Sequence, residues 1–191
     1  MSERKLTSVG VFCGSGGGTR SSYIEAATEL GGLLAARNLR LVYGGGGRSK
    51  NGKPGMMGSV ADACLAGGGS VTGVIPTFLA GFENAHPGVS DMRFVGTMAE
   101  RKDVLIAESD AFVILPGGIG TLDELFEVVT WNQLKLVDKA VLVVNTQGVF
   151  DGLAAWYERA VSEQFVPAHG GGVPVFVSTP AEAIERLIGK A

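Results

Sequence analysis

The sequence has few of the side chains that bind metals or form disulfides. Its 191 residues include two cysteines and two histidines, which are scattered along the chain. Their spacing matches no metal site, so we expect none. Cys13 and Cys64 each lie in an apolar setting, which is typical of buried free thiols in the reducing cytoplasm.

Charge and hydropathy exclude further classes of protein. The net charge is −3, and no block of lysine and arginine indicates a nucleic-acid-binding surface. No apolar run is long enough to cross a bilayer, and the first residues lack the apolar core of a signal peptide. With 46% hydrophobic and 18% charged residues, the chain is not disordered. We expect a cytoplasmic globular protein without a nucleic-acid or membrane partner.

Glycine, in contrast, is abundant, and the 30 glycines gather where apolar segments end. Short apolar segments alternate with segments of helical periodicity. Strands are expected at residues 8–13, 40–43, 70–75, 92–95, 111–115, 140–144 and 173–177. Helices are expected at 21–37, 56–66, 97–109, 150–164 and 180–188, with another beginning at Thr121 and an irregular segment at 77–90. The alternation predicts one Rossmann-like α/β domain over residues 1–191, a doubly wound, mostly parallel sheet with helices on both faces.

The stretch from residue 111 to residue 131 combines a buried strand, a glycine turn and a helix. Residues 111–115 are all apolar, which is typical of a parallel strand covered on both faces. Three glycines follow within 117–120, and Thr121 then opens the helix. Free N–H groups and the positive end of a helix dipole would point into this turn. The stretch therefore predicts an anion site, and a phosphate is the first hypothesis.

Thr121 and Glu124 also have a purely structural interpretation. A threonine at the N-cap and a glutamate three residues later form a capping box, in which each side chain accepts a backbone N–H of the other. Asp123 points about a quarter-turn away from Glu124, so the two carboxylates cannot act on one substrate atom. The structural and functional interpretations of Glu124 are compatible.

Arg101 and Lys102 lie beside the apolar stripe of the helix at 97–109. A charge placed there is costly unless it is paired. Either both side chains extend along the helix to water, as is usual for lysine, or they have a partner. Glu124 and an anionic ligand are the partners that we consider.

Two other glycine-rich loops match nucleotide-binding motifs only in part. Residues 14–19 have Thr19 where a dinucleotide fingerprint needs its third glycine, and no acidic residue ends the strand at 40–43. Residues 47–54 match a P-loop up to Lys53, but Pro54 replaces the hydroxyl residue that binds magnesium. We expect no bound dinucleotide, and we interpret the second loop as a basic surface loop.

Two motifs resemble those of the Lonely Guy family, phosphoribohydrolases that activate cytokinins and are often mislabelled lysine decarboxylases. PGGIGTLDE at 116–124 resembles the family motif PGGxGTxxE, and MAERK at 98–102 resembles MxxRK. The similarity extends over most of the chain up to about Val166, and includes FCGS at 12–15, YGGG at 43–46, VIP at 74–76 and VTW at 129–131. It implies hydrolysis of the N-glycosidic bond of adenosine or cytokinin riboside 5′-monophosphates to free base and ribose 5-phosphate.

The resemblance also implies roles for single residues. Arg101 and Glu124 would be catalytic: departure of the base leaves positive charge on the ribose, which a carboxylate can stabilise. Residues implied to bind substrate or its phosphate are Ser15, Glu83, Met98, Lys102, Gly117, Gly118, Gly120, Thr121 and Thr130. The resemblance implies no metal or organic cofactor. It implies that the protein forms a homodimer.

Three departures from the family pattern leave the preferred base open: Gly16 replaces a serine, Ala99 replaces a histidine, and the loop carrying Arg48–Lys53 is longer. The alternative function is a non-catalytic nucleotide-sensing module on the same fold, against which Arg101 and Glu124 argue. A pyridoxal-phosphate-dependent lysine decarboxylase is rejected, because the chain is short and nothing marks a Schiff-base lysine.

Overall fold

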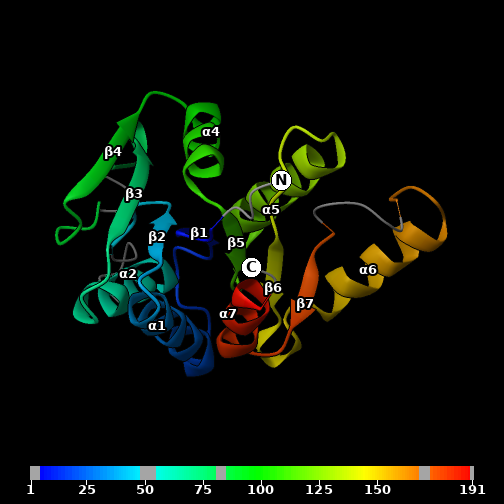
Figure 1. The fold of residues 1–191 in the computed structure, drawn as a ribbon, viewed down its shortest axis with the longest axis horizontal. Coiled ribbons are helices and arrows are strands. Elements are labelled where there is room, and N and C mark those ends of the chain that lie inside the picture. The colour runs from blue at the N-terminus through cyan, green and yellow to red at the C-terminus, as the bar shows by residue number, and fades with distance from the viewer. Residues whose placement is uncertain (1–4, 48–54, 81–84, 168–172, 190–191) are drawn as a thin grey trace.

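The computed structural model describes residues 5–47, 55–80, 85–167 and 173–189. In this part of the chain, seven parallel strands form one sheet in the order β4-β3-β2-β1-β5-β6-β7 (Figure 1). The strands are β1 (Ser8–Phe12), β2 (Arg40–Tyr43), β3 (Val71–Pro76), β4 (Asp91–Val95), β5 (Ala111–Ile114), β6 (Val141–Val144) and β7 (Val175–Val177). The predicted α/β fold is confirmed.

Helices cover both faces of the sheet. They are α1 (Ser21–Ala36), α2 (Met56–Ala66), α3 (Thr77–Ala80), α4 (Met98–Glu108), α5 (Ile119–Gln133), α6 (Asp151–Ser162) and α7 (Pro180–Ile188), with a 3₁₀ turn η1 (Thr146–Gly148). Apolar residues of α1, α2 and α7 pack on one face, and those of α4 and α5 pack on the other. Within the described ranges, no helix has the length and apolar character needed to span a membrane.

The strands are apolar without alternation because both of their faces are buried. In β5, Ala111 and Val113 join the core cluster beneath α1 and α2, while Phe112 and Ile114 join the cluster beneath α4 and α5. This arrangement matches the expectation for a parallel strand between two helical layers. The 3₁₀ turn after β6 was not predicted, and it contains a non-glycine residue, Gln147, at φ 56°.

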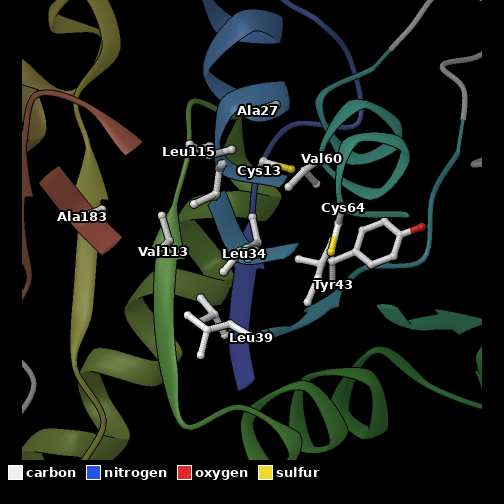
Figure 2. Packing of buried hydrophobic residues seen from close by; sticks show 14 of the residues in the cluster. Cys13, Ala27, Leu34, Leu39, Tyr43, Val60, Cys64, Val113, Leu115 and Ala183 are labelled. Carbon is white, nitrogen blue, oxygen red and sulfur yellow. The ribbon is translucent and has the colours of Figure 1, made fainter. Parts of the chain in front are cut away.

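Both cysteines are buried free thiols, as predicted. Figure 2 shows Cys13 and Cys64 among the apolar side chains of the cluster that lies under α1 and α2. Predicted and observed element bounds agree to within two residues. The segment 77–90 contains one short helix, α3, before it enters residues 81–84, which lie outside the described part.

Helices α1 and α2 approach each other closely through one glycine. A Cβ added at Gly31 would lie under 3.0 Å from the Val60 carbonyl oxygen and from the Ala63 Cβ atom. The neighbouring Gly32 is exposed, and a Cβ added there would meet nothing within 4 Å. The two glycines of one helix therefore have different reasons to be present, and only Gly31 is required by packing.

We predict opposite effects of one substitution at these neighbouring positions. Gly31→Ala should lower the free energy of unfolding by roughly 1–3 kcal/mol, because the added methyl overpacks the contact with α2. Gly32→Ala should raise it by about 0.5–1 kcal/mol, because alanine is favoured over glycine inside a helix. Urea unfolding of both variants measures this; equal effects would contradict the packing explanation.

Candidate active site

The site lies where the connections of the sheet change direction. Strands β1 and β5 are neighbours, and β2 to β4 extend from one side of this pair while β6 and β7 extend from the other (Figure 1). Ligands of open α/β sheets bind outside the carboxyl ends of the strands at such a point. Here the loops that follow β1 and β5 are joined by a hydrogen bond, in which the Gly14 N–H donates to the Pro116 carbonyl at 3.0 Å.

A cavity of about 180 Å³ opens beside these loops. Residues from β1 to α5 line it: Cys13, Gly14, Ser15, Met57, Met98, Arg101, Gly118, Gly120, Thr121 and Glu124. A second cavity of about 350 Å³ adjoins it and shares Gly14, Ser15 and Gly118. The topology therefore brings Arg101 from α4 and Glu124 from α5 to the wall of one pocket.

Helix α5 begins two residues earlier than predicted, and the predicted capping box is wrong. Gly118 is the N-cap, and the Leu122 N–H donates to its carbonyl at 3.1 Å. Thr121 therefore lies in the first helical turn and Glu124 in the helix interior, so neither can occupy its capping-box position. The helix starts early because Gly118 adopts the extended conformation of an N-cap, so that the residues from Ile119 onward are helical.

The early start leaves the first turn of α5 without a side-chain cap. Its backbone N–H groups and the positive end of its dipole adjoin the pocket, where Gly120 and Thr121 form part of the wall. A Cβ added at Gly118 or Gly120 would meet nothing within 4 Å. Packing within the chain does not require glycine at either position, whereas close approach of a ligand to the backbone would.

Arg101 is buried, with 3% of its surface exposed. Its Nη2 atom donates to the Gly44 carbonyl at 3.0 Å. The start of α4 is fixed by a cap, in which the Thr97 hydroxyl accepts the Glu100 N–H at 3.1 Å and the Glu100 carboxylate accepts the Gly96 N–H at 2.7 Å. Of the two explanations offered by the sequence, extension of Arg101 to water is wrong.

Glu124 is buried as well, with 6% of its surface exposed. A carboxylate and a guanidinium therefore face one small cavity at the uncapped end of a helix. In such a setting water screens charges poorly, so their effect on a bound ligand is larger than in solution. The arrangement can bind an anion and place a carboxylate beside it.

The other residues implied by the resemblance fall into three groups. Ser15, Met98, Gly118, Gly120 and Thr121 line the pocket with Arg101 and Glu124, and Gly117 lines the adjoining cavity. Thr130 is exposed further along α5 and lines neither of these cavities. Lys102 on α4 also lines neither cavity, and contacts Asp123 and Glu127. Glu83 and the basic loop at 48–53 lie outside the described residues.

Sequence reasoning missed the role of Gly44. A Cβ at this position would lie under 3.0 Å from Nη2 of Arg101, so a side chain at residue 44 would require the buried guanidinium to shift. The segment YGGG at 43–46 was noticed as similar to the family, but no pattern in the sequence connects it with Arg101. Cys13 and Met57 were also not predicted to line the site.

No metal centre is found in the described part of the chain: no three histidine, cysteine or acidic side chains there are grouped as metal ligands.

A model of the family described as "Possible lysine decarboxylase" matches residues 57–187. The "Probable cytokinin riboside 5′-monophosphate phosphoribohydrolase LOGL9" of Oryza sativa subsp. japonica is 47% identical over 93% of this chain and 75% of its own length. The cytokinin riboside 5′-monophosphate phosphoribohydrolase LOG4 of Arabidopsis thaliana is 41% identical over 98% of this chain and 84% of its own length.

The chain belongs to the Lonely Guy family of cytokinin riboside 5′-monophosphate phosphoribohydrolases. The resemblance seen in the two motifs is thereby confirmed. As a Lonely Guy protein, the chain carries MxxRK at the start of α4 and PGGxGTxxE across the β5–α5 turn, and the fold brings the arginine of one and the glutamate of the other together.

Solved structures of other proteins share the fold. The molybdenum cofactor binding protein of Rippkaea orientalis matches with a TM-score of 0.69 at 18% identity, over 98% of this chain and 99% of its own. The molybdenum cofactor carrier protein of Chlamydomonas reinhardtii matches with a TM-score of 0.69 at 22% identity, over 97% of this chain and 98% of its own. At this identity the likeness concerns the fold alone, and the Lonely Guy assignment rests on the closer relatives.

We predict that the cost of a side chain at residue 44 depends on Arg101. Gly44→Ala should destabilise the protein by roughly 1–3 kcal/mol, because the methyl displaces the buried guanidinium. In an Arg101→Met background the same change should cost at least about 1 kcal/mol less, since residues in direct contact are energetically coupled. A double-mutant cycle by urea unfolding measures the coupling, and additive effects would contradict the contact.

Proposed function

We propose that the protein hydrolyses the N-glycosidic bond of adenosine-type 5′-monophosphates, including N6-modified cytokinin riboside monophosphates, and releases free base and ribose 5-phosphate. One observation carries the proposal: the buried Arg101 and Glu124 face the same cavity as the uncapped N-terminus of α5. The relatives at 40–47% identity are named cytokinin riboside 5′-monophosphate phosphoribohydrolases.

The phosphate of the substrate would bind at the start of α5. Gly118, Gly120 and Thr121 line the cavity there: Gly118 is the N-cap, and Gly120 and Thr121 lie in the first turn of the helix, where backbone N–H groups have no carbonyl of the helix to donate to. A phosphate dianion is stabilised by such N–H groups and by the helix dipole. The ribose would then extend from this end of the cavity toward Arg101 and Glu124.

Glu124 would act on the reacting carbon of the ribose. As the bond to the base breaks, positive charge develops on the sugar, and the carboxylate stabilises it. The same carboxylate can orient the attacking water, whose hydroxyl joins the ribose while a proton goes to the departing base. The guanidinium of Arg101 would balance the negative charges of the carboxylate and the phosphate in the buried cavity.

The geometry does not support the decarboxylase chemistry named in the family description. A pyridoxal-phosphate enzyme needs a lysine in its site to form the Schiff base. Among the residues with described positions, no lysine lines either cavity. Lys102 contacts Asp123 and Glu127 instead.

We predict that Glu124→Gln lowers the rate of base release on the order of 10²–10⁴-fold. Glutamine keeps the size of the side chain but removes the charge that stabilises the ribose, and the melting temperature of the variant is measured beside that of the unaltered protein to establish that it is folded in the assay. The assay follows free base and ribose 5-phosphate from AMP and from isopentenyl-AMP, with the exposed Glu158→Gln as control. If the unaltered protein binds both nucleotides and cleaves neither, it is a nucleotide-sensing module.

We also propose a cytoplasmic location. Cys13 and Cys64 are buried free thiols, and free thiols are typical of proteins from a reducing compartment.

A homodimer is proposed as the functional assembly. Large apolar side chains are exposed, among them Phe94 on the edge strand β4 and Ile119, 84% exposed, at the start of α5. Burial of such side chains against a second copy would be favourable. We predict that sedimentation velocity gives twice the chain mass of 19.7 kDa at micromolar concentration. A fully active monomer would contradict the proposal.

A further inference from the structure

Lys102 follows Arg101 in the chain but has different neighbours. Its ammonium lies 3.1 and 3.3 Å from the two carboxylate oxygens of Asp123 and also contacts the carboxylate of Glu127. The Lys102 side chain is only 16% exposed. Asp123 and Glu127 are four residues apart on α5 and so lie on one face of that helix. The three side chains form one cluster, here called the α4–α5 clamp.

The clamp joins the two helices that carry the reacting side chains. Lys102 is adjacent to Arg101 on α4, and Asp123 is adjacent to Glu124 on α5. The backbones of α4 and α5 make few close approaches to each other. Because Lys102 and Asp123 are chain neighbours of Arg101 and Glu124, a shift of the two helices at the clamp would move these two side chains relative to each other. Catalytic geometry is sensitive to displacements of this kind, and about 1 Å can change a rate 10²-fold.

The charges of the clamp disfavour a direct contact between Lys102 and a phosphate. One ammonium and two carboxylates leave the cluster with a net negative charge, which repels a dianion. Hydrogen bonding to Glu127 raises the pKa of Lys102, burial opposes this, and Asp123 adds to the rise. To reach a phosphate, the ammonium would have to leave two charge-assisted hydrogen bonds.

We propose that Lys102, Asp123 and Glu127 are positioning residues, which hold α4 against α5 and so set the placement of Arg101 relative to Glu124 without touching the substrate. This inference rests on the proposed function. It assigns Lys102 a different role from the one implied by the family motif, in which the residue lies near the phosphate.

The test compares turnover with binding. Lys102→Met should lower kcat about 10- to 100-fold, while KM and the Kd for ribose 5-phosphate stay within about 3-fold. If Lys102 instead binds the phosphate, the loss of a charged hydrogen bond should weaken ribose 5-phosphate binding about 10- to 100-fold. Lys102→Arg keeps the charge and should restore at least a third of kcat. The exposed Lys5→Met and Glu158→Gln serve as matched controls that should change neither quantity.

A double variant tests whether the residues act together. Glu127→Gln should lower kcat about 3- to 10-fold, and Lys102→Met/Glu127→Gln should be no slower than Lys102→Met alone. Additive losses, or a weakened Kd in Lys102→Met, would overturn the inference. If the unaltered protein cleaves no nucleotide, the proposed function fails. The positioning role is then decided by ribose 5-phosphate titration, where weaker binding by Lys102→Met overturns it and unchanged binding supports it.

Discussion

Arg101 places a guanidinium group where only 3% of its surface is exposed, and much of the site follows from that constraint. A buried guanidinium needs hydrogen-bond acceptors, because burying an unsatisfied charge is very costly. The Gly44 carbonyl supplies one of them, and it can approach only because residue 44 has no side chain. The cap at Thr97 fixes the start of α4, so the guanidinium is held at the cavity wall rather than reaching for water.

Glycines near the site serve two distinct purposes. At Gly44 and Gly117, an added Cβ would collide with Arg101 or with the Thr121 side chain, so glycine is required for packing within the chain. At Gly118 and Gly120, an added Cβ would meet no protein atom within 4 Å. The second pair lies where the helix N-terminus meets the cavity. Packing within the chain does not explain these two glycines. Recognition of a phosphate by backbone N–H groups does require open space next to the backbone.

The sequence was sufficient to predict the strands and the helical layers, and the resemblance of two motifs to a family singled out Arg101 and Glu124, which the fold brings to one cavity. Continuous apolar runs and regular alternation with helices identify a parallel sheet, and its topology brings the ends of β1 and β5 together. The predicted start of α5 was wrong. A threonine followed three residues later by a glutamate matches a capping box whether or not the helix has already begun in the preceding glycine segment. The contact between Gly44 and Arg101 was not predictable, because it joins segments far apart in sequence through a backbone carbonyl that any residue possesses.

The fold by itself does not determine the function. Proteins named as carriers or binders of molybdenum cofactor share this fold, so the fold is not specific to one function. What argues for chemistry here is the placement of two buried, oppositely charged side chains around one cavity. Replacing buried charges by apolar residues of similar size is often neutral or stabilising, so stability of the fold does not explain their presence. In the proposed reaction, which develops positive charge on a sugar beside a bound phosphate, both would be used: the carboxylate would stabilise the charge that forms, and the guanidinium would keep the carboxylate and the phosphate together in a cavity that would otherwise be strongly negative.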